Sequence, residues 1–363
     1  MSIKITTSVA LALGVLLLAG GAMAQSYVGS DTCKQCHEDK YNDFSASGHP
    51  YKLHTAADAR SWPIPLPTGY DWDDISYVIG GYGWKVRYMN AEGYIITDSG
   101  GAPGNNQYNP ATGQWADYHA GEVKPYNCGS CHTTGFSPTG NQGDLPGIEG
   151  TWAFEGIQCE ACHAQGPHHV TDPSSANIVV DRSSAACNSC HVRGDPDLIP
   201  ASGGFVRHRE QGNELLASPH AALDCVTCHD PHKKANFSIV TQCVDCHIEM
   251  SDVKAAFKGL GRKHVAAGLE CLDCHMPYTA KSAVAQNPYK GDMRSHQFAI
   301  TTDRDVEFFN EAGTLANGTL TGEWVCLGCH TNVQEKYEAR GRPERAVNWA
   351  RRGVKRIHRR IRR

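Results

Sequence analysis

One pattern constrains this chain more than any other: its 16 cysteines form eight Cys-x-x-Cys pairs, and a histidine directly follows each pair. Chance does not place a histidine after every pair, because histidine occupies only 19 of 363 positions. Disulfides and zinc sites need no histidine at that position. The pairs, called motifs 1 to 8 in chain order, are Cys33, Cys36 and His37; Cys128, Cys131 and His132; Cys159, Cys162 and His163; Cys187, Cys190 and His191; Cys225, Cys228 and His229; Cys243, Cys246 and His247; Cys271, Cys274 and His275; and Cys326, Cys329 and His330.

Covalent haem attachment explains this pattern. Two cysteines three positions apart reach the two vinyl groups at one edge of a porphyrin and form thioethers, and the next residue falls beneath the iron as its proximal ligand. We therefore expect eight covalently attached c-type haems. Only 40% of the residues are hydrophobic and 8% aromatic, so the macrocycles would supply much of the apolar interior. The expected fold class is a multihaem cytochrome c, with irregular loops and short α-helices wrapped around eight haems.

The second axial ligand of each iron decides whether it carries electrons or binds a reactant. After a predicted cleavage behind residue 24, only four methionines remain, which are too few for eight irons. Eleven histidines lie outside the motifs, so the composition predicts two histidines on most or all irons and low reduction potentials. These eleven are His49, His54, His119, His168, His169, His208, His220, His232, His264, His296 and His358.

Seven of these histidines are the predicted distal ligands, because they lie near a motif or stand alone in stretches that otherwise lack a ligand. They are His49, His119, His208, His220, His232, His264 and His296. One of the adjacent residues His168 and His169 would be the eighth. We expect His54 to be a spare histidine and His358, in a basic tail, to be solvated.

The spacing of the motifs predicts the organisation of the chain. An N-terminal module (25–126) holds motif 1, a core module (127–300) holds six motifs, and a module at 301–339 holds motif 8. The interval between motifs 1 and 2 predicts a small antiparallel β meander, with strands at 75–79, 84–89 and 94–97.

The two ends of the chain differ in composition from the rest. Residues 1–24 have the basic start, apolar stretch and small-x-small ending of a secretory signal peptide, which predicts export to the periplasm or cell surface. Residues 340–363 carry eleven Lys or Arg and one acid, so the rest of the chain has a net charge of −14. The tail is interpreted either as a basic amphipathic segment that touches an anionic membrane, a partner or a neighbouring subunit, or as a solvated end.

Several phrases resemble a known family. Among them, "YVGSDTCKQCHEDKYNDFSASGHPYKL", "LPGIEGTWAFEGIQCEACHAQGPHHV" and "KHVAAGLECLDCHMPYTAKSAVAQNPYKGDMRSHQF" are similar to the exported multihaem cytochromes c. The resemblance favours His169 over His168, because relatives have one histidine before the valine, and it marks His54 as spare. It also implies distal roles for His220, His232, His264 and His296. The family includes filament-forming cytochromes.

The sequence therefore predicts an octahaem electron-transfer protein of anaerobic or extracellular respiration, whose partners are other redox proteins or copies of itself in a filament. No catalytic residue is assigned. The alternative is an oxidoreductase that acts on a small nitrogen or sulfur compound at one open haem. A net charge of −4 and a pI near 6.5 disfavour nucleic acid as a partner.

Overall fold

The computed structural model describes residues 26–250, 264 and 266–361. The predicted signal peptide lies outside the described residues, and so does the side chain of His358.

Short helices dominate the described chain, and small sheets accompany them. The α-helices are α1 (Ser30–Lys34), α2 (Glu38–Ser45), α3 (Ala56–Ala59), α4 (Gly129–His132), α5 (Cys159–His163), α6 (Pro167–Thr171), α7 (Ser184–His191), α8 (Gln211–Leu216), α9 (Cys225–Cys228), α10 (Cys243–Cys246), α13 (Cys271–His275), α14 (Gly322–Cys326), α15 (Thr331–Glu338) and α16 (Glu344–Ile361). Single 3₁₀ turns are found at Pro50–Lys52, Gln142–Asp144, Ser175–Asn177, Ala235–Phe237 and Ile248–Met250.

The strands are also short. They are β1 (Leu53–Thr55), β2 (Ile75–Gly80), β3 (Val86–Asn90), β4 (Asp98–Ser99), β5 (Ala102–Pro103), β6 (Gln107–Asn109), β7 (Gln114–Ala116), β8 (Thr133–Thr134), β9 (Phe154–Glu155), β10 (Ile199–Ser202), β11 (Phe205–Arg207), β12 (Ala280–Lys281) and β13 (Leu315–Ala316). Two larger sheets have the orders β1-β2-β3-β6-β7 and β12-β11-β10-β13.

Each motif forms about one helical turn. The backbone N–H of His37 donates to the carbonyl oxygen of Cys33 at 2.9 Å, and His229 and Cys225 repeat this bond at 3.0 Å. A turn of this kind brings residues i, i+3 and i+4 to one side of the chain, so both cysteines and the histidine face the same space. The local geometry that haem attachment needs is therefore present in the protein.

The N-terminal sheet confirms two of the three predicted strands. Strands β2 and β3 pair in antiparallel register, with Val78 opposite Tyr88. The predicted strand at 94–97 is wrong, because Ile95 makes only isolated bridges, to Met89 and Lys124. The neighbour of β3 is instead β6, from further along the chain. A buried polar side chain fills the intervening bend: the Asn106 amide donates to the Ile96 carbonyl oxygen at 2.8 Å.

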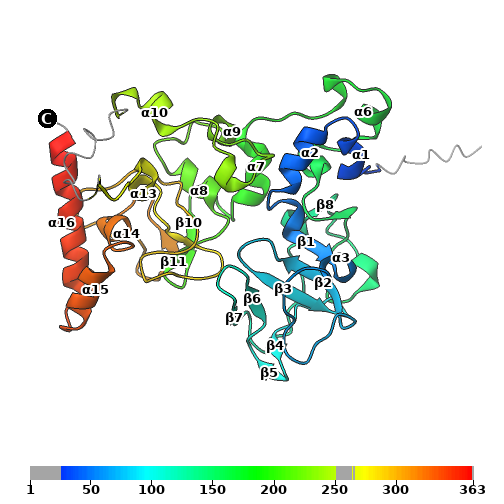
Figure 1. The fold of residues 1–363 in the computed structure, drawn as a ribbon, viewed down its shortest axis with the longest axis horizontal. Coiled ribbons are helices and arrows are strands. Elements are labelled where there is room, and N and C mark those ends of the chain that lie inside the picture. Colours follow the sequence, from blue (N-terminus) through cyan, green and yellow to red (C-terminus); the bar gives the residue numbers. More distant parts are fainter. Residues whose placement is uncertain (1–25, 251–263, 265, 362–363) are drawn as a thin grey trace, which may run out of the picture.

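The apolar clusters lie towards the two ends of the molecule. Leu53, Met89 and Ile148 belong to the N-terminal clusters, while Phe308 and Trp324 belong to the C-terminal ones. No residue of these clusters comes from the described parts of 160–198 or 207–279, which carry motifs 3 to 7. Figure 1 shows the N-terminal sheet and α16 at opposite ends, with α7, α9 and α10 between them.

Helix α16 is packed against the body of the protein. Ala346, Ala350 and Val354 are buried along one of its faces. The buried Arg351 guanidinium donates to both carboxylate oxygens of Glu323, at 2.7 and 2.9 Å, and also binds Glu307. The described part of the tail is therefore a docked helix, and the alternative of a solvated end is wrong for it. None of the helices in the described residues combines the length and apolarity that a membrane crossing requires.

We expect Arg351→Met to loosen α16. The substitution leaves the Glu323 carboxylate buried without its cation, which costs about 3 kcal/mol. Hydrogen exchange of the α16 amides should show a fall of that size in the free energy of local opening. The matched control is Arg352→Met, because Arg352 is exposed on the same helix. Equal exchange in the two variants would contradict the proposed anchoring.

Candidate functional site

Six imidazole pairs form the main feature of the candidate site. Each pair joins one motif histidine to one histidine from outside the motifs, and the ring centroids lie 5.7–6.5 Å apart. The pairs are His37 with His169, His191 with His49, His163 with His232, His247 with His220, His229 with His296, and His330 with His264.

This spacing fits an iron held between two imidazoles. A metal–imidazole bond is about 2 Å long, so two bonds and two ring radii place the centroids about 6 Å apart. Direct ring stacking would bring them closer, as for Tyr51 and Tyr82 at 4.4 Å. The residues present therefore fit a haem iron at each of these six pairs.

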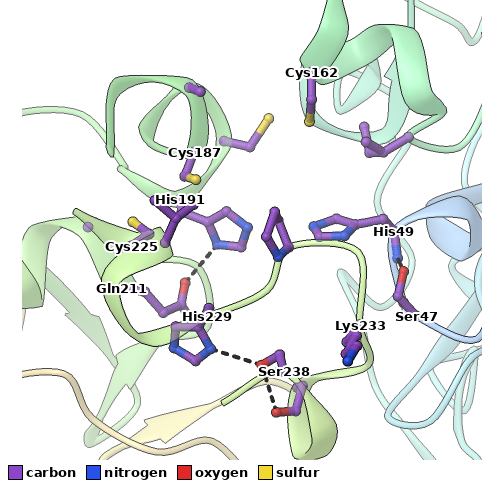
Figure 2. Close-up of a pocket in the computed structure, with 18 of the residues that line it drawn as sticks. Ser47, His49, Cys162, Cys187, His191, Gln211, Cys225, His229, Lys233 and Ser238 are labelled. Carbon is purple, nitrogen blue, oxygen red and sulfur yellow. Dashed lines mark hydrogen bonds between the residues drawn. The ribbon is translucent and has the colours of Figure 1, made fainter. Parts of the chain in front are cut away.

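Hydrogen bonds orient several of these rings so that the opposite nitrogen points into the gap. His163 Nδ1 lies 2.7 Å from the Val179 carbonyl oxygen, and His169 Nδ1 lies 3.0 Å from that of Ser174. A carbonyl oxygen only accepts, so Nδ1 carries the proton and Nε2 keeps the lone pair that a metal binds. Figure 2 shows His191 held by Gln211 and His229 held by Ser238.

One large cavity connects five of the six imidazole pairs, all but His330 with His264. Its volume is about 3570 Å³, and its lining includes cysteines of motifs 1 to 7. A site for a single small ligand typically has roughly 300–1,000 Å³. The cavity therefore has room for several large planar groups side by side.

Contacts between the motifs give their order along this cavity. Helix α1 contacts α5, which joins motifs 1 and 3, and α7 contacts α9, which joins motifs 4 and 5. Cys162 of motif 3 is close enough to motif 4 to raise the pKa of Cys187. Motifs 1, 3, 4 and 5 therefore follow one another in space.

The row continues towards the C-terminal end. Burial raises the pKa of Cys228 and of Cys271, and the nearby motif 6 thiols add to both shifts, which places motifs 5, 6 and 7 near one another. Cys274 of motif 7 in turn raises the pKa of Cys326, and α13 contacts α14. The row ends at motif 8.

Motif 2 stands beside this row. Its Cys131 Sγ lies 4.0 Å from the carbonyl oxygen of Ser189, the residue before Cys190 of motif 4, and α4 contacts α7. The segment that directly follows motif 2 also contacts motif 3, because β8 packs against α5 and the Gln158 backbone N–H donates to Thr134 Oγ1 at 2.8 Å. Motif 2 therefore lies beside the row, next to motifs 3 and 4.

Two motif histidines have no imidazole opposite them among the described residues. His132 packs near Tyr126, with centroids 6.4 Å apart, and His275 Nδ1 donates to the Phe298 carbonyl oxygen at 2.8 Å. His208 shares the cationic neighbours of His132, but no ring contact between the two is found in the described chain. The predicted distal role of His208 thus stays a prediction.

The other predicted histidines have distinct surroundings. His119 is exposed, and its Nδ1 lies 2.7 Å from a Glu122 carboxylate oxygen rather than opposite a motif histidine. His54 packs edge-on against Trp62, and its expected spare role stays a prediction. His169, not His168, is the one that faces His37.

Positive charge surrounds His132. Burial, together with Lys52, Arg209, Lys85 and Arg87, lowers its pKa to about 3. Burial is also the main cause that lowers the pKa of His208, to about 2, and Lys85, Arg209, Arg87 and Arg193 add to it. At neutral pH both rings are uncharged, which is the form that binds a metal.

Sequence reasoning missed the residues that orient the imidazoles. Asp230 binds His232 Nδ1 at 3.1 Å, and Ser238 lies 2.9 Å from His229 Nδ1. Asp230 could have been found, because it lies between the two histidines in the sequence His229–Asp230–Pro231–His232. Nothing in the sequence connects Val179 with His163, since the loop that joins them has no regular pattern.

Comparisons with known proteins find similar cytochromes. A profile of the family described as cytochrome c554 and c-prime matches residues 106–164. No curated protein sequence matches the chain. The octaheme sulfite reductase MccA of Wolinella succinogenes is similar in structure, with a TM-score of 0.59, 18% identity, and coverage of 84% of this chain and 65% of that one.

Two cytochromes named for the outer cell wall or the S-layer are also similar in structure. Outer cell wall cytochrome OcwA has a TM-score of 0.55 and 18% identity, and the match covers 86% of this chain and 88% of OcwA. The undecaheme cytochrome from the S-layer of Carboxydothermus ferrireducens has a TM-score of 0.47 and 20% identity, over 70% of this chain and 51% of that one. The chain thus spans about half of the S-layer cytochrome and less than two thirds of MccA. At these identities, the likenesses to MccA and OcwA show a shared fold.

We expect the haem-free chain to unfold unevenly. The apolar clusters at the two ends keep their contacts, whereas 160–198 and 207–279 lose the groups around which they wrap. Hydrogen exchange of protein made without haem attachment should show protection in β2 and β3 and fast exchange in α5, α7 and α9. The haem-loaded protein is the control. Equal protection of all five elements in the haem-free chain would contradict this prediction.

Proposed function

We propose that this chain, which has the fold of the multihaem c-type cytochromes, carries electrons through eight low-potential haems outside the cytoplasm. Each c-type haem supplies a one-electron Fe(III)/Fe(II) couple. The chain would attach the haems through its eight pairs of motif cysteines and hold at least six irons between two histidines. We also propose that it serves respiration with an external or periplasmic redox protein as partner.

The six imidazole pairs carry this proposal. In each of them both faces of the iron would be occupied by side chains of the protein, at the 5.7–6.5 Å spacing of the rings. A closed iron exchanges electrons without binding a reactant, and two imidazoles favour a low reduction potential. We therefore propose the six histidines that face a motif histidine as distal ligands. His119 and His208 are the two predicted distal ligands that lie in none of these pairs.

The row of motifs supports a conducting role. Motifs 1 and 8 lie at its two ends, and helix contacts link motif 1 with 3, motif 4 with 5 and motif 7 with 8. Electrons could thus enter near α1 and leave near α14, or travel in the opposite direction. Polymerisation into a filament would extend the same row and stays a prediction.

Replacing His232 tests the role of the paired histidines. We expect His232→Ala to leave one iron with a free face, which should appear as a high-spin ferric signal and as carbon monoxide binding after reduction. His54→Ala is the matched control, because His54 is also half-buried but lies opposite no motif histidine. A wholly low-spin spectrum in His232→Ala would contradict the assignment.

An oxidoreductase acting on a small nitrogen or sulfur compound is the second candidate. It is favoured by His132 and His275, which face no imidazole among the described residues. Carbon monoxide binding to the reduced wild-type protein, together with a high-spin ferric signal, would support an open iron. We expect neither signal if His208 and another residue close these two sites, and their absence would favour the carrier.

A further inference from the structure

A buried carboxylate lies within motif 3 and has no role in the proposed haem attachment. Glu160 stands between Cys159 and Cys162 on α5, and only 4% of its surface is exposed. A buried carboxylate is unfavourable unless hydrogen-bond donors satisfy its oxygens. Here the donors are backbone N–H groups from two other segments, so this one side chain joins three parts of the chain.

Both oxygens of this carboxylate accept hydrogen bonds. Oε2 accepts the backbone N–H of Val28 at 2.9 Å and that of Gly29 at 2.8 Å, immediately before α1. Oε1 accepts the backbone N–H of Gly166 at 2.8 Å, immediately before α6. Hydrogen bonds to an ionised group are roughly twice as strong as those between neutral groups. Glu160 therefore fixes the starts of α1 and α6 relative to motif 3.

Helix α6 depends on such an anchor because it buries none of its own residues. Its start lies against the start of α1: a Cβ atom added at Gly166 would lie 3.2 Å from the Val28 side chain and 3.5 Å from Glu160 Oε1. Figure 1 shows α6 beside α1 at this end of the molecule. The Ser174 carbonyl oxygen orients the His169 ring, but Ser174 is exposed and close to α6 in the sequence. The bond at Gly166 therefore ties the helix to motifs 1 and 3.

Both imidazoles of the motif 1 pair lie on segments that Glu160 holds. His169 lies three positions after Gly166, and His37 lies three positions after the end of α1. Their rings are nearly parallel, at 16°, with centroids 6.1 Å apart. Motif 1 also ends the row, where Cys36 and His37 are exposed. An iron at this end would be within reach of small solutes without its second imidazole, so its closure depends on where α6 is held.

We propose that Glu160 is the positioning residue of motif 1: it sets His169 opposite His37 and so keeps the iron at motif 1 closed to small ligands. This inference rests on the proposed function, because it requires a haem at motif 1. Glu160 acts through the backbone, by placing the segment that carries the ligand. Motif 3 thus supplies both its own attachment site and the support for a ligand of its neighbour in the row.

Carbon monoxide binding to the reduced, haem-loaded protein tests this proposal. Glu160→Ala should bind one more equivalent of carbon monoxide than the wild-type protein, and its oxidised form should show an added high-spin ferric signal. His169→Ala should do the same. The double variant should bind no more carbon monoxide than His169→Ala alone, because both changes open the same iron.

Asp292→Ala is the matched control. The Asp292 carboxylate also accepts three backbone N–H bonds, from Ser282, Ala283 and Val284, but in the loop after β12. Its removal leaves the same number of backbone donors without an acceptor, and we expect no additional carbon monoxide binding. Glu160→Gln keeps one acceptor oxygen, so it should bind an intermediate amount, and it carries the test if Glu160→Ala does not assemble.

The remaining outcomes separate this proposal from the proposed function. The positioning role is overturned if both Glu160 variants bind as little carbon monoxide as the wild-type protein, if the double variant binds a second additional equivalent, or if Asp292→Ala binds as much as Glu160→Ala. Fewer than eight covalent haems in the wild-type protein would instead overturn the octahaem carrier, and the mass of the intact protein measures that separately.

Discussion

The opposition of two imidazoles across a gap is the constraint on which this structure depends. Each pair joins segments that are far apart in the chain, such as His37 with His169 and His49 with His191. A hydrocarbon core usually provides such long-range links, but the described segments carrying motifs 3 to 7 contribute no residue to the apolar clusters. Metal bonds through these pairs would therefore replace core packing as the source of tertiary order.

The sequence predicts the attachment chemistry almost completely and the tertiary pairing hardly at all. A Cys-x-x-Cys-His segment is local, so its helical turn follows from spacing alone, and β2 and β3 follow from alternating residues around a glycine-rich turn. The partner of each motif histidine depends on loops without periodicity. The expected strand at 94–97 was wrong because a bridge to Lys124 and the bend at Asn106 divert the chain towards β6.

The charged side chains beside the histidines differ from one motif to the next along the row. The chain keeps carboxylates beside several histidines of the row: Asp230 lies 3.1 Å from His232 and 3.7 Å from Lys40, and Glu214 lies 3.7 Å from His296. Asp230 is half-buried and Glu214 is buried, so these charges interact more strongly than they would in water. The same imidazole ligation can therefore give different potentials at different motifs, because the surroundings differ while the ligands do not.

The packing of α16 indicates which kind of surface the basic tail can contact. Its apolar residues Ala346, Ala350 and Val354 are buried against the chain's own body, so they are not available to enter a lipid layer. Trp349 remains partly exposed and lies 5.2 Å from the ring of His330, at the end of the row. Arg345 and Arg352 are exposed on the same helix, which packs beside the last motif. An acidic surface that binds these arginines would come close to the end of the row, and this favours a protein partner over a membrane as the contact of α16.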